Sequence, residues 1–132
     1  MSTINNKQLG NKGEDLAADL LESKGYKILE RNFFCGKNEI DIIALSPCKT
    51  YIVFVEVKTR NTDYFNHPYE AVNANKQLSI IKVANSYIKR NNIDLEARFD
   101  IISIVANEDR YSLEHIIRAF EPVLSYQSNW HR

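Results

Sequence analysis

Two strand-forming runs lie so close together in this sequence that they are expected to pair with each other. Residues 38–45 and 51–58 are both rich in β-branched and aromatic side chains, which favour strands. The five residues between them, 46–50, include Pro47 and are typical of a turn. Because antiparallel strands are the ones that a short turn can join, the sequence predicts an antiparallel hairpin here.

The register of this hairpin gathers four charged side chains at one place. Centring the turn on residues 48–49 places Asp41 opposite Glu56. The same register places Glu39 opposite Lys58, and such neighbours have Cβ atoms about 4.5–5.5 Å apart. Charges beside apolar strands are costly unless water or a ligand satisfies them. Two carboxylates beside an ammonium suit a divalent cation and a phosphodiester. Alternation assigns the apolar residues to the opposite face, namely Ile40, Ile42, Ala44, Val53, Val55 and Val57.

Length and composition predict one compact domain over residues 1–132, with mobile tails at 1–6 and 125–132. A chain of 132 residues, 44% of them apolar, can bury a core without metal or disulfide support. Its 17 Lys and Arg balance its 17 Asp and Glu. This balance argues against the basic surface of a strong non-specific nucleic-acid binder, but it leaves room for a local basic patch.

The cysteines and the hydropathy of the sequence predict the cellular compartment of the protein. Cys35 and Cys48 have no metal-ligand spacing, so a reduced, cytoplasmic protein is expected. The first residues lack the apolar core of a signal peptide. No run approaches the roughly 20 apolar residues of a membrane span, so no membrane partner is expected.

Seven elements are predicted, in the order helix, three strands, helix, two strands. Apolar residues at helical spacing indicate helices at 7–24 and 72–90, and Gly25 suits a left-handed end to the first. Because a strand–helix–strand unit has parallel strands and a right-handed crossover, we expect an α/β fold. Its mixed sheet of about five strands is flanked by helices. The strands are expected at 26–34, 38–45, 51–58, 99–106 and 112–120, with a polar loop over 59–69.

Asp41, fourteen intervening residues and then Glu56-Val57-Lys58 together resemble the signature of the PD-(D/E)XK nuclease superfamily. The element order resembles the restriction-endonuclease-like fold of that superfamily, which archaeal Holliday junction resolvases share. Over roughly residues 8–120 the chain is similar to the uncharacterised bacterial YraN family. The matching segments are 10–14 with Ala17, 25–26, Asn32, 39–44, 54–60, Pro68, 71–72, Lys76 and 98–100.

The chain departs from the YraN pattern at two places. Asn38 replaces a usual glycine before Glu39, and Phe65-Asn66-His67-Pro68 stands where the family tends to have Phe-Gly-x-Pro. Neither change replaces a residue of the signature, and Asn tolerates a positive φ better than most residues do.

The resemblance implies a metal site on the hairpin. Asp41 and Glu56 would hold Mg²⁺ or Mn²⁺, with the main-chain carbonyl of Val57 as a further ligand and waters completing the octahedron. The cation would polarise the scissile phosphate and activate a water. Lys58 would orient that water and stabilise developing charge in preference to acting as a general base. Glu14 would be the catalytic acid of the first helix, reaching a second ion or a metal-bound water; its alternative is an ordinary first-turn acid.

Other charged residues have supporting or structural interpretations. Glu39 is expected to support the site by holding Lys58. Arg60 and Lys76 are candidate nucleic-acid contacts to phosphate, although a single basic side chain is more often solvated surface. Asp100 begins a strand and is expected as a cap or turn ligand. The histidines are too scattered for a zinc site or a nucleophile-activating pair, although the first could approach substrate from the polar loop: His67, His115 and His131.

Three functions are compatible with these residues. The first is a Mg²⁺-dependent endonuclease acting on DNA. The resemblance to resolvases suggests branched DNA, and a homodimer would suit a four-way junction. The second is a nuclease fold that binds nucleic acid without cutting it, and the third is a protein-interaction module. Metal binding separates the first from the third, and cleavage with and without Mg²⁺ separates the first from the second.

Overall fold

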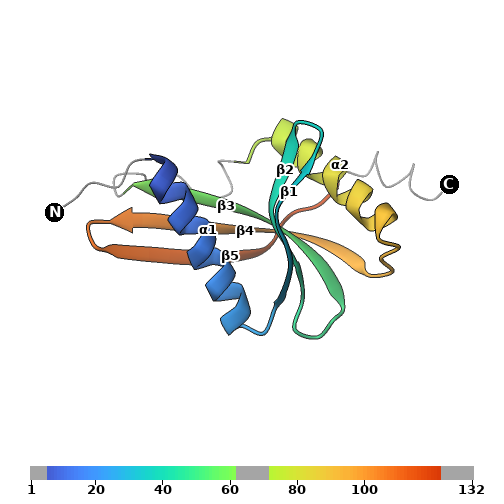
Figure 1. Ribbon diagram of the computed structural model, residues 1–132, viewed down its shortest axis with the longest axis horizontal. Coiled ribbons are helices and arrows are strands. Elements are labelled where there is room, and N and C mark those ends of the chain that lie inside the picture. Colours follow the sequence, from blue (N-terminus) through green and yellow to red (C-terminus); the bar gives the residue numbers. More distant parts are fainter. Residues whose placement is uncertain (1–5, 62–71, 123–132) are drawn as a thin grey trace.

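The computed structural model describes residues 6–61 and 72–122, with side chains described from Lys12 onward. The predicted order of elements is confirmed (Figure 1). The first helix begins and ends one residue earlier than predicted, and strands β3 and β4 are longer, because pairing with each other extends both. The elements are α1 (Asn6–Ser23), β1 (Lys27–Cys35), β2 (Asn38–Leu45), β3 (Tyr51–Asn61), α2 (Ala74–Arg90), β4 (Glu96–Asn107) and β5 (Arg110–Phe120).

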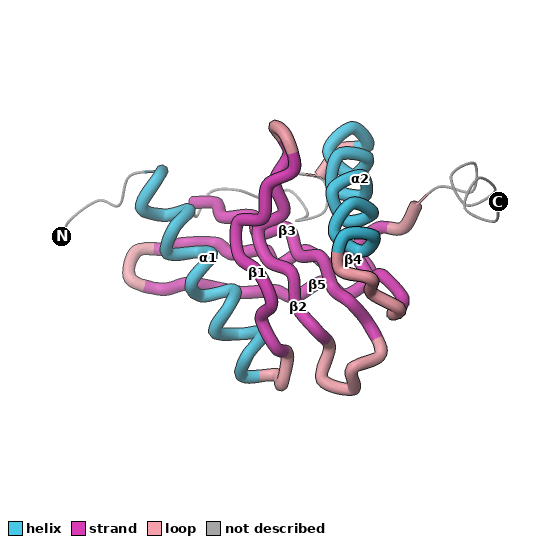
Figure 2. The backbone as a smooth tube through the Cα atoms, turned by 45° about the vertical axis from the view of Figure 1, so that its right-hand side comes forward, coloured by secondary structure: helices cyan, strands magenta, loops and turns pink. Residues whose placement is uncertain are grey.

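The five strands form one mixed sheet in the order β1-β2-β3-β4-β5. Strands β3 and β4 are parallel and α2 connects them, whereas the other neighbouring pairs are antiparallel. The expected α/β architecture is therefore confirmed, and it agrees with a restriction-endonuclease-like fold. Figure 2 shows the sheet strongly twisted, with the β1–β2 hairpin steeply inclined to the β4–β5 hairpin. The first three residues of the expected loop at 59–69 belong to β3, which extends to Asn61. The rest of that segment lies outside the described residues, as do both expected tails apart from Asn6.

Helix α1 covers one face of the sheet. Its buried side chains, such as Ala17 and Leu21, pack with residues from β2, β3 and β4. As predicted, Gly25 adopts the left-handed conformation that stops the helix just after its last residue, with a φ of 93°. The Gly25 N–H donates to the carbonyl of Glu22 and the Tyr26 N–H to that of Leu21, which is the Schellman arrangement.

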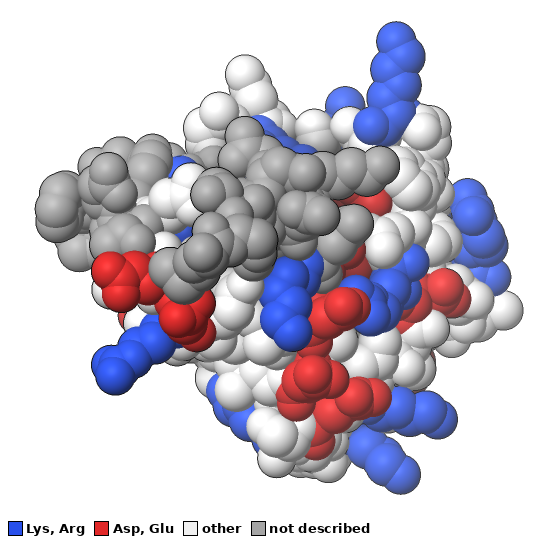
Figure 3. All heavy atoms as spheres, turned by 60° about the vertical axis from the view of Figure 1, so that its left-hand side comes forward, with Lys and Arg blue, Asp and Glu red and all other residues white. Residues whose placement is uncertain are grey.

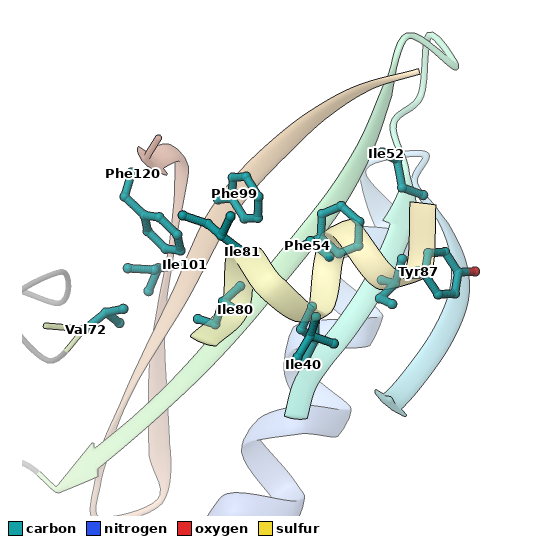
Figure 4. Packing of buried hydrophobic residues seen from close by; sticks show 13 residues of the cluster. Ile40, Ile52, Phe54, Val72, Ile80, Ile81, Tyr87, Phe99, Ile101 and Phe120 are labelled. Carbon is teal, nitrogen blue, oxygen red and sulfur yellow. The ribbon is translucent and has the colours of Figure 1, made fainter. Parts of the chain in front are cut away.

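Helix α2 covers the opposite face. The buried apolar residues on this face form a second hydrophobic cluster. Phe54 lies at its centre, with Ile80 and Tyr87 from α2 around it (Figure 4). The helix begins after Asn73, whose side chain accepts a hydrogen bond from the Lys76 N–H at 2.9 Å. This cap fixes the first turn of α2 and with it the position of Lys76.

Strand β2 does not keep one alternation along its whole length. The predicted apolar face is wrong for Ile40, which packs on the α2 side. It is right for the other predicted residues, which pack with α1, namely Ile42, Ala44, Val53, Val55 and Val57. The cause lies in β1, where Asn32 has a φ of 53°. Asn32 stands opposite Asp41, because the pairs Arg31–Ile42 and Phe33–Ile40 flank it in one register. A left-handed residue interrupts the pleat, so the side chains beyond it change faces.

Candidate active site

The centre of the candidate site is a pair of carboxyl groups, of which Glu56 is buried and Asp41 is half-buried. The β2–β3 ladder runs from Leu45–Ile52 to Ile42–Val55, which confirms the predicted register. The next step along it brings Asp41 beside Glu56, whose exposed fraction is 6%. The Val57 N–H donates to Asp41 Oδ2 at 2.8 Å.

The pKa values of both carboxyl groups are raised, mainly by burial. For Glu56 the neighbouring Asp41 adds to the effect, and together they raise its pKa to about 7. For Asp41 burial prevails over the lowering effect of the Val57 hydrogen bond and of two nearby lysines, so its pKa is also raised. Two acids this close share a proton more readily than both ionise.

Two lysines approach this pair from different elements. Lys58 Nζ lies 4.0 Å from Glu56 Oε2, and Lys76 Nζ lies 3.9 Å from the same oxygen. Both side chains are partly exposed, and both distances exceed a hydrogen bond. The lysines therefore offset only part of the burial, because partly solvated ion pairs are weak. Lys76, predicted as a phosphate contact, lies in the same cluster as the carboxylates.

Glu14 and Glu39 form a second group of acids next to the first. With its amide nitrogen turned toward them, Asn32 donates to Glu39 Oε2 at 3.0 Å and to Glu14 Oε1 at 3.1 Å. Burial raises the pKa of each of these acids, and Asp41 raises both further. Glu14, predicted on the basis of family resemblance, is thus brought to the edge of the site.

The predicted ion pair between Glu39 and Lys58 is not what the structure contains. Within the described residues, Lys58 has its ion pair with Glu56, and Glu39 has its hydrogen bond with Asn32. The physical reason is the left-handed turn of Asn32, which brings its amide to Glu39. Glu39 therefore belongs to the acids on the α1 side.

A close helix–strand contact places α1 beside these residues. A Cβ atom built on Gly13 would lie 2.0 Å from Thr59 Cγ2 of β3. Only a glycine allows that approach, although it weakens a helix interior by roughly 0.5–1 kcal/mol. The neighbouring Glu14 is thereby brought close to β3.

Arg60 continues the row of alternate β3 side chains that begins with Glu56 and Lys58. It is level with Val105 of the parallel strand β4 and is partly buried. Its position is compatible with the predicted phosphate contact, which stays a prediction. His67 and His131 lie outside the described residues.

Asp100 has a larger structural role than the predicted cap or turn ligand. It is fully buried, Arg98 donates to its two carboxylate oxygens at 3.0 and 2.8 Å, and the Arg118 N–H donates at 3.1 Å. His115 Nε2 lies 2.7 Å from Asp100, and Lys24 Nζ lies 2.6 Å from His115 Nδ1. A lysine ammonium can only donate, so we assign the His115 proton to Nε2, from which it donates to Asp100.

The charged surface is mixed in sign. On the face in Figure 3 acidic and basic side chains are interspersed, and neither sign covers the whole face. No three His, Cys, Asp or Glu side chains of the described residues are grouped closely enough to hold a metal ion by themselves. None of the described helices is long and apolar enough to span a membrane.

Comparison with known proteins places the chain in a family. The model of the uncharacterised protein family UPF0102 matches residues 13–104. The chain belongs to the UPF0102 family. A UPF0102 protein of Caldanaerobacter subterraneus is 48% identical over 124 residues, 91% of this chain and 100% of that protein. One from Geobacter metallireducens is 49% identical over 120 residues, 90% and 97% of the two chains. One from Pelobacter propionicus is 45% identical over 118 residues, 88% and 84%.

The part of the chain that matches UPF0102 contains every predicted site residue, from Glu14 to Lys76. From the sequence, Asn32 was recognised only as part of the pattern of the YraN family, and no role was predicted for it. One signal was available: asparagine inside a strand-forming run is unfavourable, so its presence there indicates a special backbone position.

Proposed function

We propose that this UPF0102 chain is a divalent-metal-dependent endonuclease that hydrolyses DNA. The observation that carries the proposal is the pair of a half-buried Asp41 and a buried Glu56 at the end of the β2–β3 ladder. A buried acid pair without a close cation costs stability, and sites that keep such a cost are often functional. The resemblance to PD-(D/E)XK nucleases supplies the reaction class.

The donor set fits Mg²⁺ or Mn²⁺. Both ions prefer oxygen ligands, and Asp41 and Glu56 supply two carboxylates. In a strand the N–H and C=O of one residue face the same neighbouring strand. Since the Val57 N–H faces Asp41, its carbonyl is directed to the same side and is a candidate third ligand. A cation there would supply Lewis-acid polarisation of the phosphate and a more acidic water.

The chain's own cations would handle the charge of the substrate. Lys58 and Lys76 reach the same oxygen of Glu56 from β3 and α2. Once a cation occupies the carboxylates, both ammonium groups are free to contact a phosphate placed between the two elements. Lys58 would orient the attacking water and stabilise the charge that develops on the phosphate. Lys76 and Arg60 would hold the flanking phosphates.

The mixed surface charge supports a selective substrate preference. A protein with 17 basic and 17 acidic residues makes few phosphate contacts, so plain duplex should bind weakly and with marked salt sensitivity. Selectivity would then come from nucleic-acid shape or from a second copy of the chain. Branched DNA is the first candidate, and a two-fold dimer would match a four-way junction.

The alternative is a nuclease fold that binds nucleic acid or protein without cutting. The balanced charge favours it, since a protein-interaction module needs no basic face. The complete Asp41, Glu56 and Lys58 set favours the nuclease, because a binding module has no need to keep a buried acid pair.

The deciding experiment is a cleavage panel of linear, nicked, flapped and four-way DNAs with Mg²⁺, Mn²⁺ or EDTA. We expect metal-dependent cutting that prefers branched DNA, and a loss of at least about 100-fold in Lys58→Ala. Lys82→Ala, an exposed lysine of α2, is the matched control and should retain wild-type activity. Equal cutting of all substrates would leave a general nuclease. Metal binding without any cutting would favour the binding module.

A further inference from the structure

Asn32 has a backbone conformation that is rare inside a strand. Its φ of 53° lies in the left-handed region, which Gly, Asn and Asp adopt far more readily than other residues. The strand pairs on either side of it keep one register, so it lies opposite Asp41. Strand β1 thus departs from regular geometry level with the buried acid pair.

The side chain of Asn32 joins two other elements at this point. We assign the amide nitrogen to the side of the two acids, where it lies 3.0 Å from Glu39 Oε2 of β2 and 3.1 Å from Glu14 Oε1 of α1, because only this orientation gives each acid a donor. An amide has two N–H donors, so each carboxylate receives one of them. Without this donor, Glu14 and Glu39 would face each other and Asp41 with only the more distant charges of Arg31 and Lys76 to offset them.

Asparagine combines two properties that this position needs. Glycine would accept the backbone conformation but has no donor, and aspartate would accept it but would add a further negative charge. Alanine lacks both the conformational freedom and the donor. The residue therefore serves the side-chain contact and the backbone turn together.

The opposite end of this arrangement is also fixed. Gly13 lets α1 approach Thr59 so closely that a Cβ atom would overlap it. Glu14 follows Gly13 in the helix, so its main chain is held against β3 while its side chain is held by Asn32.

We infer that Asn32 is a positioning residue of the candidate metal site, whose amide holds Glu14 and Glu39 at fixed places beside Asp41. The inference rests on the proposed function and names a further residue needed by the same site. It also explains how the carboxylate of Glu14, which belongs to helix α1, is held beside the residues of strand β2.

Metal affinity tests the inference with two variants. In Asn32→Gly the backbone is retained and the donor is lost, so calorimetric affinity for Mn²⁺ should fall by about 10-fold or more. In Asn32→Asp the donor is also lost, but an added carboxylate attracts the cation, so affinity should fall less than in Asn32→Gly. Asn92, with φ 51° in the turn after α2, supplies the matched controls Asn92→Gly and Asn92→Asp, which should leave affinity unchanged. Wild-type affinity in both Asn32 variants would overturn the inference.

A double-mutant cycle tests the same contact without metal or substrate. Urea unfolding of Asn32→Gly, Glu14→Ala and the double variant should give a coupling of about fivefold in the folding equilibrium constant, and a cycle with Asn92→Gly should give none. Additive effects would overturn the inference. If the wild-type protein binds no Mn²⁺, the proposed function fails, and this cycle alone decides whether Asn32 holds Glu14.

Discussion

Carboxyl groups are buried or half-buried in two places of the molecule, and their surroundings differ. Asp100 is satisfied on every side: Arg98 donates twice to it, and His115 and the Arg118 N–H complete the set. Burial alone would raise the pKa of Asp100, but these hydrogen bonds hold it below its ordinary value. In the other place, Asp41 accepts a hydrogen bond from the Val57 N–H, and Glu56 has two lysines at about 4 Å from one oxygen. The pKa values of both acids are raised.

The difference separates a structural charge from a functional one. The Asp100 cluster connects β4, β5 and the end of α1, and it leaves no oxygen without a donor to attract a ligand. The Asp41–Glu56 pair is short of positive charge, which is the condition that a divalent cation would relieve. A buried acid with too few partners is therefore the better indication of a site in this chain.

The largest effect is expected from Asp100→Ala. It would leave Arg98, which is 7% exposed, without its carboxylate, and breaking a buried ion pair costs about 3–5 kcal/mol. Urea unfolding would measure the loss. Asp15→Ala, which removes an exposed ion pair with Arg31 at 2.9 Å, is the control and should cost about 0–1 kcal/mol. Equal losses in both variants would remove the contrast between the two regions.

The second prediction concerns pH. Because the folded pKa of Glu56 is raised from 4.5 to about 7, the folded state binds more protons than the unfolded state over that range. Stability should therefore fall as the pH rises from about 4.5 to 7, by at most about 3 kcal/mol. The lowered pKa of Asp100 acts in the opposite direction and only in acid, where stability falls as pH drops below its ordinary value of 3.8.

Thermal unfolding across this pH range would test the assignment. Glu56→Gln should flatten the decline between pH 4.5 and 7, and saturating Mg²⁺ should do the same by favouring the ionised pair. A decline that persists unchanged in Glu56→Gln would assign it to other groups and weaken the proposed metal site.

The contrast between the two regions was only partly visible in the sequence. The Asp41–Glu56 register was predictable because a short turn fixes a hairpin locally. Arg98 and Asp100 stand on alternate positions of one strand, so their contact could have been inferred from spacing. The partner His115 comes from another strand and only the fold brings it in.

The same limit applies to the rest of the candidate site. Lys76 reaches Glu56 because α2 begins at a particular place over β3, and the crossover that sets this place is a tertiary feature. Ile40 lies on the α2 side because the left-handed Asn32 interrupts the pleat. A prediction from strand alternation assumes a regular pleat and cannot include this change. Local pairing was predictable from the residues, whereas individual side-chain contacts between distant elements, such as that of Lys76 with Glu56, were not.

A smaller effect is expected where α1 meets the site. Gly13→Ala would push a methyl group into Thr59 Cγ2 at 2.0 Å, and overpacking typically costs about 1–3 kcal/mol. Part of this loss is offset because alanine favours helix. Urea unfolding and Mn²⁺ titration should both weaken, since Glu14 moves with the helix. A gain in stability, as helix propensity alone would give, would show that the contact relaxes without cost.

The smallest change in stability is expected from Asp41→Asn, and it is the sharpest test of the comparison. The variant removes one negative charge from a pair of acids whose charge Lys58 and Lys76 offset only in part, and it keeps the shape of the side chain. The amide oxygen can still accept from the Val57 N–H, so the hydrogen bond at 2.8 Å is retained. Free energy of unfolding without metal should therefore stay the same or rise by about 1 kcal/mol, while Mn²⁺ binding is lost. The parallel change Asp100→Asn weakens the contact with Arg98 and should destabilise the protein instead. If Asp41→Asn costs as much stability as Asp100→Asn does, the two buried acids have the same structural role, and the basis for placing a metal at Asp41 is gone.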